Sequence, residues 1–111
     1  MKIERELMRG AGPVAVLKLL ERGEMYGYEL VAALASRTKG VLAMGQSTLY
    51  PMLYNLEAKG LIASRVDNKG ARPRRYYRLL GKGKRRLARQ AEQWRAVTGA
   101  MSALGVMEIT T

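Results

Sequence analysis

Residues in the middle of the chain are predicted to form a helix with a short, uncharged polar surface. At about 100° per residue, five side chains point away from the apolar stripe of this helix. They are Ser47, Tyr50, Pro51, Tyr54 and Asn55. Hydroxyl and amide groups can hydrogen-bond the edges of bases in a DNA groove, whereas an exposed helix face without such a role usually carries Glu and Lys. Base contact is therefore one interpretation, and an ordinary solvated helix face is the other.

The helix that carries this surface is predicted over residues 47–59. Its buried face has four apolar residues at the i, i+3, i+4, i+7 spacing, namely Leu49, Met52, Leu53 and Leu56. Ser47 is expected to cap the N-terminus and Gly60 to end the helix. Pro51 is expected within or next to the first turn, where a missing backbone donor costs least. The polar residues lie near the N-terminal end, which enters the major groove in helix-turn-helix proteins.

Basic residues are concentrated after this helix. The 111-residue chain has 20 Lys and Arg against 9 Asp and Glu, a net charge of +11. Half of the basic residues lie at positions 69–89, and no acid occurs between Asp67 and Glu92. Such an excess predicts a polyanionic partner, and nucleic acid is favoured over an anionic membrane surface. A solubilising surface is the alternative, but such surfaces usually mix both signs.

Four basic residues fall at the tip of a predicted hairpin: Lys69, Arg72, Arg74 and Arg75. There they are expected to bind phosphates, which fixes register without choosing sequence, or to enter a minor groove. A second basic group continues into the C-terminal helix: Lys82, Lys84, Arg85, Arg86 and Arg89. For that group, phosphate contact and a solvated surface are both open interpretations.

The composition excludes several classes of site. The chain has no Cys and no His, so it cannot form a disulfide, a Cys or His zinc site, a Ser-His-Asp triad or a Cys-His nucleophile. The few acids are scattered, which argues against a catalytic carboxylate pair. We therefore expect that the protein is not an enzyme and that it binds neither a cofactor nor a metal. No stretch is apolar enough for a signal peptide or a membrane span, so a cytoplasmic location is expected.

The elements that position these residues follow from periodicity. Helices are predicted over residues 13–22 and 28–37, before the central helix, and Gly10, Gly12 and Pro13 are expected to interrupt any earlier helix. The loop before the central helix is expected to turn three side chains inward: Val41, Leu42 and Met44. Strands at 61–66 and 75–79 predict a hairpin. This order predicts one α+β, mainly α domain, a winged helix-turn-helix with a two-stranded wing, over residues 1–80.

A long helix is predicted from residue 83, with an apolar stripe spaced at sevens, threes and fours. Its residues are Leu87, Trp94, Val97, Met101 and Leu104, with Met107 as a further candidate. The stripe extends beyond what a winged helix needs, so residues 81–111 are predicted to form a dimerisation helix that packs on a second copy. Gly99 and Gly105 each weaken the helix by about 1 kcal/mol relative to Ala, so partner packing is expected to hold it.

Three segments at these separations resemble the PadR family of bacterial transcriptional regulators: MYGYEL at 25–30, STLYPMLYNLEAKGLI at 47–62 and ARPRRYYRL at 71–79. The resemblance covers residues 10–94. It implies a winged helix-turn-helix that binds DNA, a homodimer made by one C-terminal helix as in the short members, and usually a repressor relieved by a small molecule. The residues that match the DNA-reading motif are Ser47, Thr48, Tyr50, Pro51 and Tyr54. The wing would span residues 65–78.

The start of the last helix departs from the family pattern. Where members commonly have Leu-Thr, with the Thr suited to N-capping, this chain has Leu79, Leu80 and Gly81.

Trp94 has two interpretations. In an apolar helical stripe it can anchor a dimer core. By position it also resembles the tryptophan that lines a pore between the subunits of some multidrug-sensing members. In that case Val97 and Met101 would form flexible apolar walls, and a planar aromatic or cationic small molecule is the expected effector.

Together these features predict a transcriptional regulator, a ligand-responsive repressor that binds double-stranded DNA at a pseudo-palindromic operator as a homodimer. A non-specific, architectural nucleic-acid-binding protein is one alternative, but it has no use for the uncharged polar helix face. A winged-helix module that recruits a protein partner through Trp94 is another, and the acid-free basic stretch argues against it.

Overall fold

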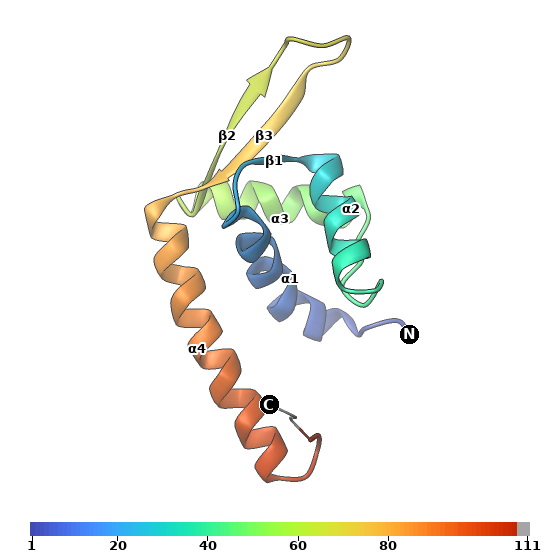
Figure 1. The fold of residues 1–111 in the computed structure, drawn as a ribbon, viewed down its shortest axis with the longest axis vertical. Helices are drawn as coiled ribbons and strands as arrows, with labels where there is room; N and C mark the ends of the chain where they lie inside the picture. The colour runs from blue at the N-terminus through green and yellow to red at the C-terminus, as the bar shows by residue number, and fades with distance from the viewer. Residues whose placement is uncertain (109–111) are drawn as a thin grey trace.

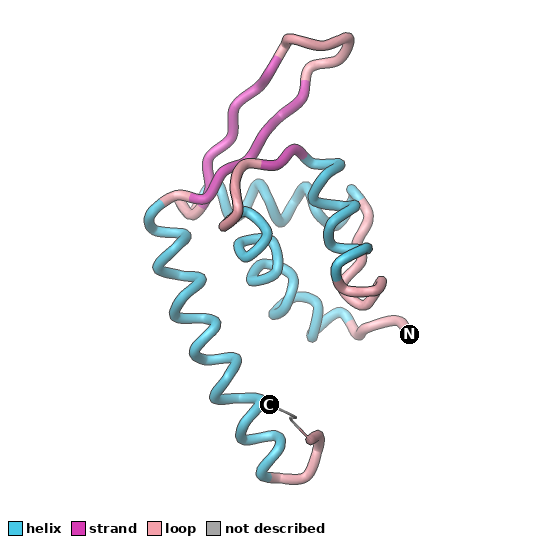
Figure 2. The backbone as a smooth tube through the Cα atoms, in the orientation of Figure 1, coloured by secondary structure: helices cyan, strands magenta, loops and turns pink. Residues whose placement is uncertain are grey.

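The computed structural model describes residues 1–108 (Figure 1). Its elements follow in the order α1 (Arg5–Leu20), β1 (Met25–Tyr26), α2 (Gly27–Arg37), α3 (Gln46–Ala58), β2 (Ile62–Asp67), β3 (Arg74–Leu79) and α4 (Gly81–Ala103). Helices α1, α2 and α3 form a cluster, the β2–β3 hairpin projects from one end of it, and α4 leaves as a long arm (Figures 1 and 2). The predicted α+β, mainly α winged helix-turn-helix is confirmed. Residues 109–111 of the predicted 81–111 segment lie outside the described residues.

The sheet has three strands instead of the two expected for the wing. β1 adds to β3, so the antiparallel order is β1-β3-β2. Met25 pairs with Tyr77 and Tyr26 with Tyr76, while β2 pairs with β3 from Ile62–Leu79 out to Asp67–Arg74. The predicted hairpin is confirmed to within one residue at each strand. β1 was not predicted, because a strand of two residues has no periodicity to detect.

The core lies between the three clustered helices, the base of the hairpin and the first turns of α4. The side chains buried in it are Val16, Leu17, Leu19, Leu20, Leu30, Leu34, Met44, Leu49, Leu53, Leu56, Leu61, Ile62, Tyr77 and Leu87. The predicted buried face of α3 is confirmed, with Met52 packed at its edge. Each fully buried leucine contributes roughly 1.5–3 kcal/mol by leaving water.

α1 begins at Arg5 and not at residue 13, so the predicted interruption is wrong. Pro13 lacks the N–H that the carbonyl of Arg9 would accept from, yet the helix runs through it. Packing holds this part of the helix, because tertiary contacts outweigh local propensity. A Cβ at Gly12 would lie 2.7 Å from Cε of Met52, so this glycine leaves room for the Met52 side chain of α3.

The segment between α2 and α3 turns inward less than predicted. Met44 is buried and Leu42 is half-buried, but Val41 is exposed. The turn is made by Lys39 and Gly40, whose φ angles of 53° and 82° are in the left-handed region. Oγ1 of Thr38 accepts a hydrogen bond from the N–H of Leu42 at 3.0 Å. This local turn directs Val41 to solvent.

The prediction for the N-terminus of α3 is wrong, whereas the prediction for its C-terminus is confirmed. Gly45 is the N-cap and no side chain caps the helix, so the prediction for Ser47 is wrong. Pro51 is the sixth residue of α3, within the second turn, and it leaves the carbonyl of Ser47 without a helical donor. At the other end Gly60, with φ of 74°, stops the helix as predicted. Its N–H donates to Glu57 and that of Leu61 to Leu56, as in a Schellman motif.

α4 is continuous from Gly81 through Gly99 to Ala103, and it starts two residues before the predicted position. Leu80 is its N-cap without a side-chain hydrogen bond, in keeping with the departure from Leu-Thr. Two bonds tie this start to the end of α3 and to Leu61 just after it: the N–H of Leu80 donates to the carbonyl of Leu61 at 3.0 Å, and Nζ of Lys82 donates to that of Lys59 at 2.9 Å. Gly105 ends the helix, so Met107 lies beyond it.

Candidate nucleic-acid interface

All six residues predicted for the DNA-reading surface lie on the exposed side of α3: Ser47, Thr48, Tyr50, Pro51, Tyr54 and Asn55. Tyr54 is 77% exposed, whereas Leu49 and Leu53 of the same helix are buried. None of the six is charged, so the surface offers hydroxyl, amide and ring groups to a partner without drawing it by charge.

Tyr50 packs against the start of α2. Its ring lies over Gly27, the first residue of α2, where a Cβ would come within 2.9 Å of Cε1. A side chain at position 27 would therefore push the ring away. Tyr50 keeps 40% of its surface exposed and lines a hollow of about 440 Å³ with the wing residues 70–75. This contact joins two separate helices and was not predicted from the sequence.

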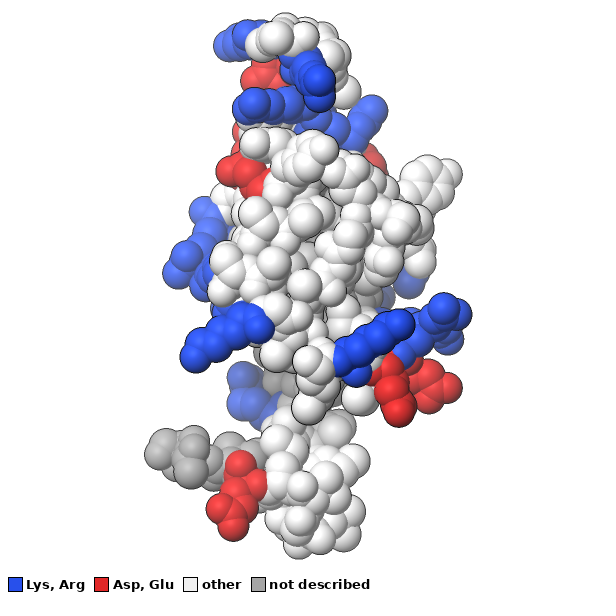
Figure 3. Space-filling model, turned by 90° about the vertical axis from the view of Figure 1, so that its right-hand side faces the viewer, with Lys and Arg blue, Asp and Glu red and all other residues white. Residues whose placement is uncertain are grey.

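The wing places its basic residues at two distinct sites. Lys69 and Arg72 lie in the connection between β2 and β3 and are exposed. The backbone N–H of Lys69 donates to Oδ1 of Asp67 at 2.9 Å, which shapes the turn. In Figure 3 Lys and Arg crowd the wing end of the molecule, above a broad uncharged surface.

Arg74 and Arg75 point to opposite faces of β3 and have partners within this chain. The Arg74 guanidinium lies 4.7 Å from the ring centroid of Tyr26. Arg75 donates to Oγ of Ser64 at 3.0 Å, and that hydroxyl donates to Oε2 of Glu57 in α3 at 2.7 Å. Only Lys69 and Arg72, of the four predicted wing residues, have no side-chain partner within the described residues.

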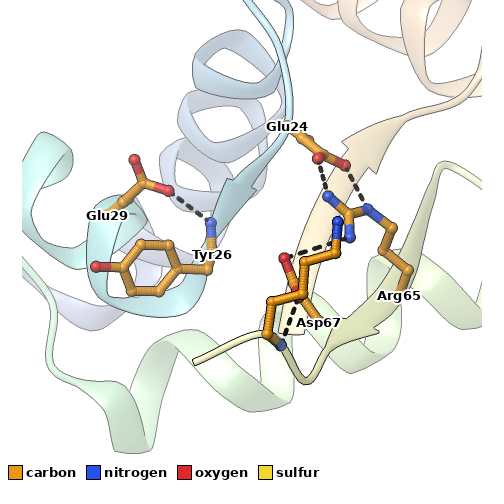
Figure 4. A network of polar contacts seen from close by, with 6 residues as sticks. Glu24, Tyr26, Glu29, Arg65 and Asp67 are labelled. Atoms are coloured by element: carbon orange, nitrogen blue, oxygen red, sulfur yellow. Dashed lines mark hydrogen bonds and ion pairs between the residues drawn. The ribbon is translucent and has the colours of Figure 1, made fainter. Parts of the chain in front are cut away.

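A network on the outer face of the sheet joins the wing to β1 (Figure 4). Nε of Arg65 donates to Oε2 of Glu24 at 3.1 Å, and a second guanidinium nitrogen contacts the other carboxylate oxygen. The same guanidinium lies 4.8 Å from the ring centroid of Tyr76. The rings of Tyr76 and Tyr26 meet edge to face at 5.5 Å. This network could not be predicted from the sequence, because Glu24 and Tyr26 meet Arg65 and Tyr76 only once β1 joins the sheet.

The ion pair to Arg65 holds the pKa of Glu24 below its ordinary value, and a hydrogen bond from the guanidinium is the main cause. We expect Arg65→Gln to raise that pKa back toward the ordinary value in a carboxyl NMR titration. Because the folded pKa is depressed, the contribution to stability is present above the unfolded pKa and is lost as pH falls through the folded one. An unchanged Glu24 pKa in Arg65→Gln would show that the pair does not persist in solution.

The apolar stripe of α4 divides into two parts. Leu87 is 5% exposed and belongs to the core of this chain, so it is not available to a partner. The remaining predicted residues are uncovered: Trp94, Val97, Met101 and Leu104. A shallow hollow of about 220 Å³ at Trp94 is lined also by Gln90, Gln93 and Val97.

Among residues 1–108, no group of three or more acidic, His or Cys side chains could hold a metal ion. Within the same range, no helix has the length and apolar composition needed to cross a bilayer.

The chain is similar in sequence and fold to known regulators. The profile of the Transcriptional regulator PadR-like family matches residues 16–89. A PadR family transcriptional regulator from Eggerthella lenta is 39% identical, with a TM-score of 0.80 over 89% of this chain and 85% of that one. A transcriptional regulator from Clostridium thermocellum is 26% identical, with a TM-score of 0.83 over 88% and 96% of the two chains. Bacillus subtilis PadR, solved in complex with operator DNA, is 28% identical, with a TM-score of 0.66 over 70% of this chain and 46% of that one.

Proposed function

The chain belongs to the PadR-like family of transcriptional regulators, and we propose that it is a repressor that binds a pseudo-palindromic operator as a homodimer. The observation that carries this proposal is the exposed, uncharged polar face of α3 beside a basic wing. Such a face discriminates bases by hydrogen bonds, while the wing supplies affinity that does not depend on sequence. Repression is favoured over activation because occupancy alone blocks a promoter.

In this proposal α3 enters a major groove and presents four residues to base edges: Ser47, Tyr50, Tyr54 and Asn55. Thr48 and Pro51 complete the surface. Lys69 and Arg72 bind phosphates or enter the neighbouring minor groove, since nothing within the described residues competes for them. Arg74 and Arg75 lie on β3, where their contacts with Tyr26 and Ser64 hold the wing in place.

The second copy packs on the uncovered stripe of α4, which begins at Trp94 and reaches Leu104. Four apolar side chains exposed along one helix favour a partner that covers them, and an isologous contact needs only this chain. The two copies of α3 then face half-sites about one helical turn, or a multiple, apart. A planar aromatic or cationic effector stacks on Trp94 between the copies.

Selection of bound duplexes from a randomised pool at about 150 mM salt tests the proposal, because purely electrostatic binding is weak there. We expect an inverted repeat. Tyr54→Ala should lose roughly 1–3 kcal/mol of preference for one base pair, while Arg72→Ala should weaken binding to all sequences and lower the salt slope by about 1. A planar cation that quenches Trp94 fluorescence should also release the selected duplex.

Two results would contradict the proposal. No enrichment, with retention that vanishes as salt rises, would favour a non-specific nucleic-acid-binding protein. Enrichment of a single half-site by a monomer would reject the homodimer and leave the Trp94 stripe to another protein partner.

A further inference from the structure

The side of α3 that faces away from the wing forms a groove with α1, and α4 joins this groove at the end of α3. Two adjoining hollows, of about 640 and 190 Å³, form the groove and share several lining residues: Arg9, Pro13, Met52, Asn55 and Lys59. The larger hollow reaches Arg5 and Thr48 near the start of α3. The smaller one reaches Arg86 beside the end of α3. The groove therefore follows α3 over its length, which is roughly 20 Å for 13 residues.

Basic side chains from three helices border this groove. Arg5 and Arg9 come from α1, Lys59 from the end of α3 and Arg86 from α4. No Asp or Glu lines either hollow. None of the four cations has an ion-pair partner in residues 1–108, where the pairs belong to Lys18 and Arg65. Like charges gathered in this way attract a polyanion.

The groove and the wing lie on opposite sides of α3. Tyr50 and Lys59 are nine residues apart, which is two and a half turns and places them on opposite flanks. Tyr50 lines the hollow that contains the wing residues 70–75, whereas Lys59 lines the groove. A helix inserted in the major groove, which is about 12 Å wide, meets a sugar–phosphate backbone on each side. The wing is placed for one of these strands and the groove for the other.

We propose that Arg5, Arg9, Lys59 and Arg86 bind phosphates of the DNA strand on the side of α3 remote from the wing. This inference rests on the proposed function and adds to it a second backbone contact, supplied by α1, the end of α3 and α4. The strand phosphates lie along the groove, with the amide of Asn55 and the hydroxyl of Thr48 between them and the bases. Basic residues of α1, of the end of α3 and of α4 thereby gain a role in affinity.

The test compares the double variant Arg9→Gln, Lys59→Gln with the control Lys18→Gln, Arg22→Gln on the duplex selected by the intact protein. Both remove two charges. Lys18 is nine residues from Arg9 and so on the opposite side of α1, and Arg22 follows that helix, exposed. Each lost phosphate contact lowers the slope of log K against log salt by about 0.9. We expect the groove variant to lose about 2 from the slope, with unchanged sequence preference, and the control to keep it.

Phosphate ethylation interference gives an independent measure. The intact protein should show two clusters of essential phosphates per half-site, and the groove variant should lose the cluster remote from the wing. The pair Arg5→Gln, Arg86→Gln provides the same test if the first variant does not fold. A groove variant with the slope of the control, while Arg72→Ala lowers it, overturns this inference and leaves the proposed function standing. If the intact protein selects no duplex, both fail together.

Discussion

Gly83→Ala should destabilise the protein by about 3 kcal/mol or more, although alanine is the better helix former. A Cβ at this position would lie 2.7 Å from Cδ1 of Leu79 and 3.0 Å from the carbonyl carbon of Leu61, with the carbonyl oxygen closer still. That carbonyl is fixed by the hydrogen bond from Leu80, so it cannot move aside without loss. Overpacking of this kind typically costs 1–3 kcal/mol, and more against backbone.

Gly99→Ala is the matched control in the same helix. No heavy atom lies within 4 Å of a Cβ there, so the change should stabilise α4 by about 1 kcal/mol. Urea unfolding at a fixed protein concentration measures both, provided the m-value is unchanged. If the two variants shift the urea midpoint in the same direction, Gly83 does not pack against Leu61 as described.

Tyr26→Ala should cost about 2 kcal/mol and loosen the wing. The change removes the edge-to-face contact with Tyr76, worth roughly 0.5–1.5 kcal/mol, and the stacking of Arg74, worth roughly 0.5–1 kcal/mol. Burial of the ring against the sheet adds to this. The wing would then keep its hairpin and its backbone pairing with β1 but lose these side-chain contacts, so operator affinity should fall as well.

Two substitutions bracket this prediction. Tyr26→Phe keeps the ring and should be nearly neutral. Tyr28→Ala removes an exposed ring two residues away and should leave the wing unchanged. Amide hydrogen exchange of β3 is the direct measurement, since loss of the anchor should speed exchange there before it affects α1. Equal exchange in Tyr26→Ala and Tyr28→Ala would contradict the anchoring role.

Local periodicity explains what could be predicted from the sequence. The buried face of α3 depends on residues three and four apart, which lie on one face wherever the helix packs, so Leu49 and Leu53 could be identified from spacing alone. The exposed face of α3 follows from the same geometry. Gly60 could be recognised as a stop because a left-handed residue after the C-cap is a local requirement.

Contacts between distant segments explain what could not be predicted. Leu87 and Trp94 share one stripe, but only the position of α4 decides that Leu87 enters the core while Trp94 remains exposed. Gly12 and Pro13 predict a break in the helix when the sequence is taken alone. Their packing beside Met52, which lies far away in the sequence, could not be foreseen. The alternation of Arg74 and Arg75 is visible in the sequence, yet their partners Tyr26 and Ser64 depend on the register of three strands.

The first turn of α4 is fixed to the segment that follows α3, and the rest of the helix extends away from this point (Figure 1). The fixed point is the contact of Gly83 with Leu61, reinforced by the hydrogen bond from Nζ of Lys82 to the carbonyl of Lys59. α4 has 23 residues and is roughly 35 Å long. A tilt of α4 by about 5° therefore displaces its far end by roughly 3 Å, given that length. In the proposed dimer, with the two chains joined at the far ends of α4, a small change in packing there would change the spacing of the two copies of α3 without altering the structure of either copy.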